Sequence, residues 1–178
     1  SLALAPNLPA QLAPHLTLGS AWGIATTLRE KGIPVSLKWP NDLVLSGRKL
    51  GGILTETRVQ QGKITKAVVG VGINWINSVP ETGINLQSFL ENHPTASITS
   101  LEMLAAITLV SIVSGYQYWQ QETIDILLSS YENLLTNLGQ KVMVDGQPGI
   151  VVGICASGDL KVRINPSTVA PPVDICLE

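Results

Sequence analysis

The chain has 178 residues, of which 45% are hydrophobic and 13% charged, and its formal net charge is −2. This length suits one domain with a small appendage, and the apolar fraction is ample for a packed core. The balanced charge gives no electrostatic footprint for nucleic acid, and no apolar run is predicted to be long enough to span a membrane.

The chain opens on a short apolar run, residues 1–5, which ends at Pro6. The run has no basic flank and is too short for a signal peptide. It is typical of a strand entered in mid-course, so we expect an upstream part of the fold. A helix is predicted over residues 18–31, because its apolar residues recur at helical spacing and Gly32 follows as a stop.

An antiparallel meander is predicted next, after a strand that ends at Lys38. Its strands cover residues 42–45, 49–58 and 64–74. The dipeptides Ser46-Gly47 and Gln61-Gly62 supply the tight turns between them.

A polar loop over residues 77–94 precedes two predicted helices. The first starts from a capping box with Thr99 as N-cap and Glu102 reaching back, and it runs to about residue 121. The second covers residues 124–136. The tail then predicts a small β-barrel with strands at 142–144, 149–155, 160–164 and 173–177, and we place the domain boundary near Leu138.

The two cysteines, Cys155 and Cys176, have no CxxC partner, so a zinc site is not indicated. We expect reduced, buried thiols and therefore a cytoplasmic protein, although the sequence leaves a disulfide between them open. His15 and His93 stand beside prolines in predicted loops, where a solvated role is expected.

The densest polar cluster is residues 38–42, with the sequence KWPND. Pro40 fixes its own φ and keeps Trp39 out of the helical region, so the turn presents Asn41 and Asp42 in a defined direction. An Asn amide can read a nucleotide edge, and an Asp can hold Mg²⁺ or pair with a lysine. A plain turn explains Pro40 to Asp42, but it does not explain the preceding Lys38 and Trp39.

The second cluster is Lys49 with Gly51 and Gly52. Glycines inside a strand indicate a bulge or a close approach by a ligand, and the lysine can neutralise a carboxylate or phosphate. A Walker A loop is excluded, because Ile53 stands where that motif requires lysine. A solvated lysine beside a hairpin is the alternative.

The third cluster is residues 70–74, with the sequence GVGIN. A dinucleotide fingerprint is disfavoured, because Trp75 replaces its third glycine and no helix follows. Gly70 and Gly72 share one face of a strand, which can accept a flat ligand, and Asn74 stands at the strand end. A kink that needs small residues remains the alternative.

Together these clusters closely resemble the central motifs of biotin–protein ligases: KWPND, then RKLxGIL(x)E over residues 48–56, then GxGIN. The resemblance covers nearly the whole chain. It implies an α+β fold, with an antiparallel or mixed sheet packed against helices as in class II synthetases. Residues 1–138 would form a partial catalytic domain and residues 139–178 a small SH3-like β-barrel.

The resemblance also implies a reaction. ATP activates biotin to biotinyl-5′-AMP, with Mg²⁺ on the phosphates, and a lysine of biotin carboxyl carrier protein then accepts the biotin. By resemblance, catalysis falls to Lys49 and Asp42 (with Asp42 also on the metal side), biotin binding to Lys49, Gly52 and Gly70, and nucleotide binding to Lys38, Trp39, Asn41, Gly72 and Asn74. No nucleic acid and no membrane is expected as a partner, and a homodimer is left open.

One family motif has no counterpart here: the GRGRxGR loop that clamps biotin and phosphates upstream of the first strand. We therefore expect this chain to be inactive or severely impaired alone. Two alternatives stay open, namely a lipoate or octanoyl transfer enzyme of the same superfamily and a non-catalytic module that binds biotin or the carrier.

Overall fold

A computed structural model describes residues 1–94, 97–164 and 172–177. Its larger sheet is antiparallel, with strand order β1-β6-β5-β4-β3 and with β2 also paired to β6. The strands are β1 (Leu2–Leu4), β2 (Leu8–Pro9), β3 (Ser36–Lys38), β4 (Asp42–Leu45), β5 (Arg48–Gln60) and β6 (Lys63–Ile73). The predicted meander is thereby confirmed as β4, β5 and β6.

The turns of this meander have the backbone that the sequence predicted. Ser46 and Gly47 have φ of 50° and 73°, and Gln61 and Gly62 have the same pair of values. Two successive residues with positive φ form the hairpin turn whose twist matches that of the strands, and a glycine at the second position lowers its cost. The peptide bond between Trp39 and Pro40 is cis.

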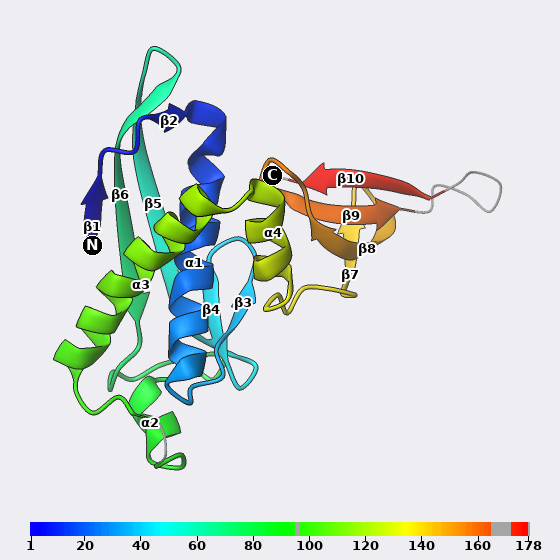
Figure 1. Ribbon diagram of the computed structural model, residues 1–178. Helices are drawn as coiled ribbons and strands as arrows, with labels where there is room; N and C mark the ends of the chain where they lie inside the picture. The colour runs from blue at the N-terminus through cyan, green and yellow to red at the C-terminus, as the bar shows by residue number, and fades with distance from the viewer. Residues whose placement is uncertain (95–96, 165–171, 178) are drawn as a thin grey trace.

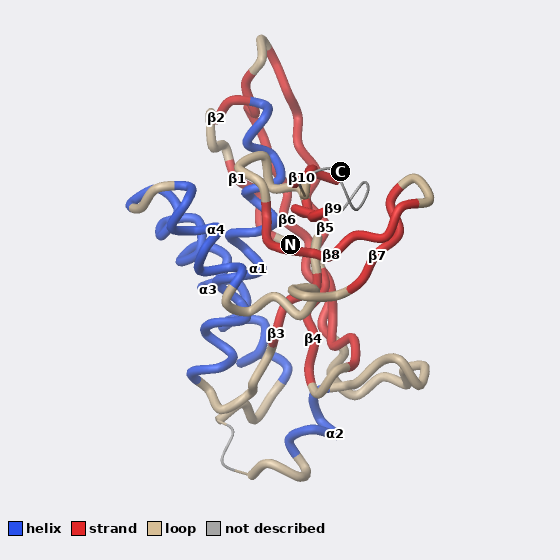
Figure 2. Tube along the Cα trace, turned by 90° about the vertical axis from the view of Figure 1, so that its right-hand side faces the viewer, coloured by secondary structure: helices blue, strands red, loops and turns tan. Residues whose placement is uncertain are grey.

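Helix α1 packs against one face of this sheet, α3 and α4 pack on α1, and the short α2 lies beyond one end of the sheet (Figures 1 and 2). The helical elements have the following bounds. They are the 3₁₀ turn η1 (Ala10–Leu12) and the α-helices α1 (Ala13–Glu30), α2 (Leu86–Leu90), α3 (Leu101–Gln121) and α4 (Ile124–Glu132). α1 and α3 cross closely because glycines line the crossing: a Cβ on Gly23 would collide with the carbonyl oxygen of Ser111, and one on Gly115 with that of Gly19.

Three helix boundaries differ from the prediction. α1 begins at Ala13 rather than at residue 18, because Pro14 is tolerated in the first helical turn. The N-cap of α3 is Ser100 rather than Thr99, since the Ser100 side chain accepts the hydrogen bond from the Met103 amide. α4 ends at Glu132 rather than at residue 136.

The earlier start of α1 changes the position of His15. This residue lies inside the helix and is 1% exposed, so the expectation of a solvated loop histidine was wrong. His93 is exposed, as expected, and its Nδ1 atom lies 2.8 Å from the carbonyl oxygen of Phe89.

Helix α3 is more apolar than the sequence analysis allowed. By length and composition alone it is long and apolar enough to cross a membrane, with a mean hydropathy of 1.2. The expectation that no run reaches this length was therefore wrong. One side of α3 packs in the core through Leu104, Ile112 and Trp119, whereas Leu109 and Val110 are exposed.

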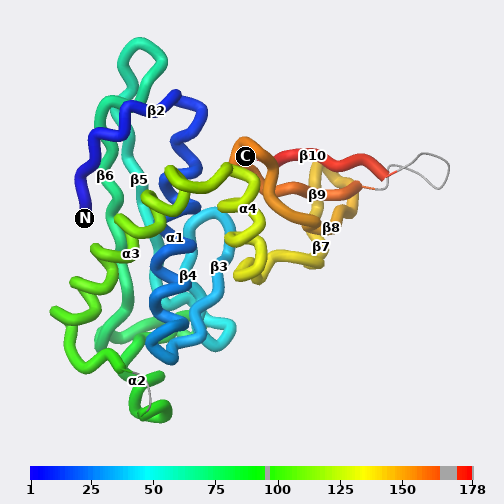
Figure 3. The backbone as a smooth tube through the Cα atoms, viewed as in Figure 1, coloured from blue at the N-terminus to red at the C-terminus, as the bar shows by residue number. Residues whose placement is uncertain are grey.

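A second antiparallel sheet follows α4 and has the strand order β10-β9-β8-β7. Its strands are β7 (Lys141–Val144), β8 (Gln147–Ile154), β9 (Leu160–Ile164) and β10 (Val173–Leu177). Figure 3 follows the chain from β1 at the edge of the first sheet into this second one. The tail strands are confirmed, while closure into an SH3-like barrel and the boundary near Leu138 stay predictions.

The two sheets share one hydrophobic core. Leu128 and Tyr131 of α4 belong to the same buried cluster as Ile24 of α1, Leu43 of β4 and Val162 of β9. Tyr131 is fully buried, and its hydroxyl donates to the carbonyl oxygen of Pro40 at 3.4 Å. α4 therefore connects the tail sheet to the KWPND turn.

Cys155 and Cys176 form a disulfide with a Cα–Cα distance of 6.1 Å, so the expectation of reduced thiols was wrong. Cys155 follows β8 and Cys176 lies in β10, and β9 pairs with both of these strands. The pairing of three strands brings together two cysteines separated by 21 residues. Local sequence gives no sign of such an approach.

Candidate active site

An ion pair connects two of the predicted motifs. The Nζ atom of Lys49, the second residue of β5, lies 2.5 Å from the Oδ1 atom of Asp42, the first residue of β4. Gly52 faces Asp42 across the two strands. A Cβ on Gly52 would stand 3.6 Å from Asp42 Oδ1 and 3.8 Å from Lys49 Cε, so the two side chains meet directly above this glycine.

The pair is accessible to a ligand. The Lys49 side chain is 55% exposed and that of Asp42 is 21% exposed. An exposed ion pair contributes little to folding stability because water screens it. Its main consequence here is positional, since the carboxylate holds the ammonium group over the glycine floor.

A strip of glycines continues from this floor along one face of β5 and β6. Gly52 faces Gly72, and Leu54 faces Gly70, so all four residues share this face. The opposite face carries Ile53 and is buried under the helices. On the glycine face Leu54 is 65% exposed, which shows that this side of the hairpin is uncovered.

The space around each glycine of β5 and β6 shows whether strand packing requires glycine at that position. A Cβ on Gly51 would collide with the carbonyl oxygen of Gly72, so strand packing requires glycine there. A Cβ on Gly72 would meet nothing within 4 Å, and the nearest atom to one on Gly70 is Ser1 Oγ at 3.5 Å. Neither residue has a positive φ. Packing therefore does not require glycine at 70 or 72, which disfavours the alternative of a kink that needs small residues.

A cavity of about 440 Å³ opens at the end of this strip. Its walls come from the second and third motif segments and from the loop after β6, namely Lys49, Gly51, Gly52, Gly72, Ile73, Asn74, Pro80, Thr82 and Gly83. The loop is held against β5, because the Lys49 amide donates to Thr82 O at 2.9 Å and the Ile84 amide to Lys49 O at 3.0 Å. This wall was not predicted from the sequence, where its only local signal is the turn-forming Pro80 and Gly83.

Asn74 lines this cavity, but its amide serves the loop. Its Nδ2 donates to Ile84 O at 3.3 Å, and its Oδ1 accepts from Asn77 Nδ2 at 3.1 Å. Its own carbonyl oxygen accepts from the Leu86 amide at 2.8 Å. Asn74 therefore shapes the cavity wall through three hydrogen bonds.

The remaining predicted residues, Lys38, Trp39 and Asn41, border this group from the side of the KWPND turn. Trp39 and Asn41 line a second cavity of about 610 Å³ between the two sheets. Asn41 makes two hydrogen bonds with the backbone of Ile53. Its Nδ2 donates to Ile53 O at 2.8 Å, and its carbonyl oxygen accepts from the Ile53 amide at 3.0 Å. Lys38 is exposed on the edge strand β3. The structure thus brings together Lys49, Asp42, Gly52, Gly72 and Asn74, with Lys38 opposite Asp42 on the neighbouring strand β3 and the carbonyl oxygen of Asn41 beside Gly52. Gly70 lies further along the strip, and Trp39 faces the second cavity.

Residues from the tail support the KWPND turn, and the sequence analysis missed them. Asn137 Oδ1 accepts the Trp39 amide at 2.8 Å, and Gly158 O accepts Trp39 Nε1 at 2.9 Å. Tyr131 bonds to Pro40 O from below, and burial, with a smaller contribution from the Asp42 charge, raises the pKa of its hydroxyl. The phenol is therefore neutral and keeps its donor.

Metal binding has little support from the protein's own donors. Within the described segments, no group of three or more His, Cys, Asp and Glu side chains is placed to hold a metal ion. The Asp42 carboxylate is already engaged by Lys49. A Mg²⁺ site built from protein groups does not fit this arrangement, so no chemical step is assigned to one.

Known proteins share both the sequence and the fold. Residues 1–74 match the sequence model of the "Biotin/lipoate A/B protein ligase family". The "Bifunctional ligase/repressor BirA" of Bacillus subtilis is 40% identical over 81 residues, which are 45% of this chain and 25% of that protein. Residues 1–74 are therefore similar to biotin and lipoate protein ligases. Because the chain spans about a quarter of the BirA relative, the activity of the whole protein is a matter of proposal.

The fold likeness extends beyond the matched sequence. The apo structure of biotin protein ligase from Aquifex aeolicus has a TM-score of 0.75 at 20% identity, covering 99% of this chain and 77% of that one. The same enzyme in complex with biotin and ATP has a TM-score of 0.70 at 23% identity, covering 99% and 73%. A ligase-like protein of unknown function from Silicibacter has 0.73 at 14%, covering 93% and 74%. These likenesses bear on the fold alone, and they place both sheets of this chain within the biotin ligase fold.

Proposed function

We propose that this chain carries part of the active site of an ATP-dependent ligase that forms biotinyl-5′-AMP and transfers biotin to a lysine of a biotin carboxyl carrier protein. The observation that carries the proposal is the Lys49–Asp42 pair at the end of an uncovered glycine strip. The similarity of residues 1–74 to biotin and lipoate protein ligases supports it. The related Aquifex enzyme has been solved with biotin and ATP.

The charge of Lys49 suits the first half-reaction. Attack of the biotin carboxylate on the α-phosphate of ATP brings two anions together and develops further negative charge at phosphorus. A fixed ammonium group lowers both costs, and the more so because Asp42 holds it in place before the substrates arrive. Lys49 is thus the proposed charge stabiliser, and Asp42 the residue that positions it.

The glycine strip suits biotin itself. A flat ring system and its alkyl chain can lie directly on the backbone of Gly52, Gly72 and Gly70, where no side chain intervenes. Leu54 on the same face offers apolar contact. The carboxylate at the end of the alkyl chain of biotin then reaches Lys49, so the proposed biotin pocket runs along the strand toward Lys49.

The nucleotide is proposed to bind at the cavity end, between the strip and the loop that contains Thr82 and Gly83. Asn74 shapes this wall, while Trp39 and Asn41 border the neighbouring cavity and act from the KWPND side. Mg²⁺ is proposed only as the ion that accompanies the triphosphate. We place the reaction in the cytoplasm, with the carrier protein as the acceptor.

The test is a comparison of binding and turnover in one preparation. In the complete protein that carries this chain, calorimetry should show both biotin and ATP titrating, and incubation with carrier protein should give biotinyl-lysine detectable by mass shift. Octanoate and lipoate are added as competing acids to test the alternative of a lipoate or octanoyl transfer enzyme. Labelling of the carrier lysine by either acid instead of biotin would establish that alternative.

Titration of both ligands without adenylate or labelled carrier would instead establish a binding module. Absence of any titration by biotin contradicts the proposal outright. The matched control is Lys49→Ala, which must lose affinity for the biotin carboxylate while the chain stays folded.

A further inference from the structure

A tight turn over residues 155–159 joins β8 to β9 in the tail sheet. The Cys155 amide donates to Asp159 O at 2.8 Å, and the Gly158 amide donates to Cys155 O at 2.8 Å. Ser157 Oγ adds a 2.6 Å hydrogen bond to Asp159 Oδ2. The turn is closed by its own bonds, so its carbonyl groups at 156 and 158 point outward with fixed directions.

Those two carbonyl groups hold two separate parts of the larger domain. Gly158 O accepts from Trp39 Nε1 at 2.9 Å, and Ala156 O lies 2.9 Å from His15 Nε2 in α1. Ser157, Gly158 and Asp159 also line the 610 Å³ cavity together with Trp39. The position of the turn therefore fixes the indole of the KWPND motif and one wall of that cavity.

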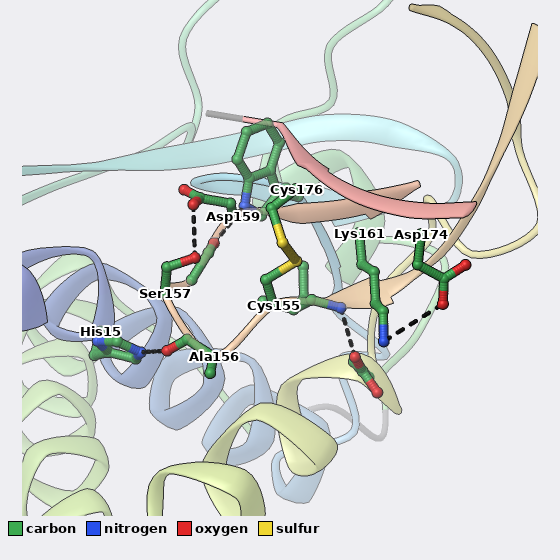
Figure 4. Close-up of a disulfide and its surroundings, with 12 residues drawn as sticks. His15, Cys155, Ala156, Ser157, Asp159, Lys161, Asp174 and Cys176 are labelled. Atoms are coloured by element: carbon green, nitrogen blue, oxygen red, sulfur yellow. Dashed lines mark hydrogen bonds and ion pairs between the residues drawn. A yellow bond between two sulfur atoms is a disulfide. The ribbon is translucent and has the colours of Figure 1, made fainter. Parts of the chain in front are cut away.

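The disulfide attaches this turn to the last strand. Figure 4 shows Cys155 at the start of the turn bonded to Cys176 in β10, with His15 approaching Ala156 from the other side. Within the described residues β10 pairs only with β9. The covalent bond is thus a direct link between β10 and the turn that holds Trp39.

The two sulfur-bearing residues differ in access. Cys155 is 9% exposed and buried against the core, whereas Cys176 is exposed. A thiolate from solution can reach a disulfide through its exposed sulfur. In a reducing compartment such an accessible disulfide is transient and redox-sensing rather than a permanent link.

We propose that Cys155–Cys176 is a thiol–disulfide exchange site, and that its reduction by a dithiol removes the covalent hold of β10 on the 155–159 turn and so weakens the hydrogen bond between this turn and the indole of Trp39. The consequence for ligand binding rests on the proposed function, because it requires the KWPND motif to serve the nucleotide. The change in the hydrogen bond of Trp39 does not rest on the proposed function.

The chemistry balances with the dithiol as the only co-reactant. One thiolate of the dithiol attacks the sulfur of Cys176, the bond between the two cysteines breaks, and Cys155 leaves as a thiolate that takes up a proton. The second thiolate of the dithiol then attacks the dithiol sulfur that is bonded to Cys176. This step closes the dithiol into a ring and releases Cys176 as a thiolate, which takes up a proton. Two electrons pass to the protein, and the dithiol becomes an intramolecular disulfide.

The experiment follows the indole N–H resonances of the ¹⁵N-labelled chain before and after treatment with dithiothreitol. Trp39→Phe assigns the Trp39 signal, and Trp22, which stacks on Tyr118, supplies an internal reference. Reduction should speed exchange of the Trp39 indole proton by about tenfold, as expected for loss of one hydrogen bond, and leave Trp22 unchanged. The double variant Cys155→Ser with Cys176→Ser should match the reduced chain and ignore the reductant.

Two results overturn the proposal. The first is an exchange rate of the Trp39 indole proton that stays the same after thiol titration has shown that both cysteines are reduced. The second is simultaneous movement of all indole signals with loss of circular dichroism, which would make the disulfide a link needed for folding only. Neither readout uses biotin or ATP, so failure of the proposed function leaves this test intact. If the reduced chain also binds ATP more weakly, the state of the disulfide affects the proposed nucleotide site.

Discussion

Asp42 and Lys49 come from two strands of one hairpin and meet over the backbone of Gly52, with 2.5 Å between nitrogen and oxygen. A side chain at position 52 would occupy the space next to both of them. The arrangement gives a positive charge with one fixed direction on an otherwise flat surface. It is the feature on which the proposed chemistry depends.

Lys49→Ala should slow adenylate formation by about 10²–10³-fold, the effect of losing one preorganised charge stabiliser. Pyrophosphate exchange measures this in the protein that carries the chain. Lys66→Ala is the matched control, because Lys66 is exposed on the distal part of β6, opposite Arg58. Equal rates for the Lys49 variant and the control would remove Lys49 from the mechanism.

Gly72→Ala should leave the free energy of unfolding within about 0.5 kcal/mol of the parent, since the added methyl group enters open space. It should nonetheless weaken biotin binding, because the methyl group stands on the strip. Gly51→Ala is the opposite case and should cost about 1–3 kcal/mol, as its Cβ meets the backbone of Gly72. Denaturant unfolding and biotin calorimetry on both variants check the contrast, and unaltered biotin affinity in Gly72→Ala would place the ligand elsewhere.

Gly23→Ala should destabilise the chain by about 1–3 kcal/mol, because the new Cβ collides with the carbonyl oxygen of Ser111 and forces α1 and α3 apart. Urea unfolding gives the value. Ser114→Ala changes an exposed position of α3 and should shift stability by at most about 0.5 kcal/mol. If both variants unfold at the same urea concentration, the close helix crossing is not a source of stability.

Stability should fall on mild acidification through His15. Burial lowers the pKa of His15 below its usual 6.5, and in the described part of the chain its Nδ1 has no hydrogen-bond partner. The unfolded chain therefore binds the proton more readily, so this contribution is complete above pH 6.5 and is lost as pH falls toward the lower folded value. Unfolding at several pH values should show the slope in the parent and in His93→Asn, and a reduced slope in His15→Gln.

The sequence by itself determined the hairpins and the motif order. Gly47 and Gly62 adopt positive φ at little cost because glycine carries no Cβ, and with the alternating apolar residues on either side they predicted the hairpins of β4, β5 and β6. The spacing of the motifs likewise identified the family resemblance that the comparisons bear out. Strand and helix boundaries were less well determined, since capping by Ser100 rather than Thr99 depends on which side chain reaches the amide.

Only the tertiary structure decided which of these residues meet. The Trp39 indole bonds to Gly158, 119 residues away, and this contact exists only because α4 brings the tail sheet onto the KWPND turn. The burial of His15 and the disulfide of Cys155 depend in the same way on segments distant in sequence. Local sequence specifies backbone dihedrals and helix or strand periodicity, whereas partners across the fold are selected by how complete elements pack.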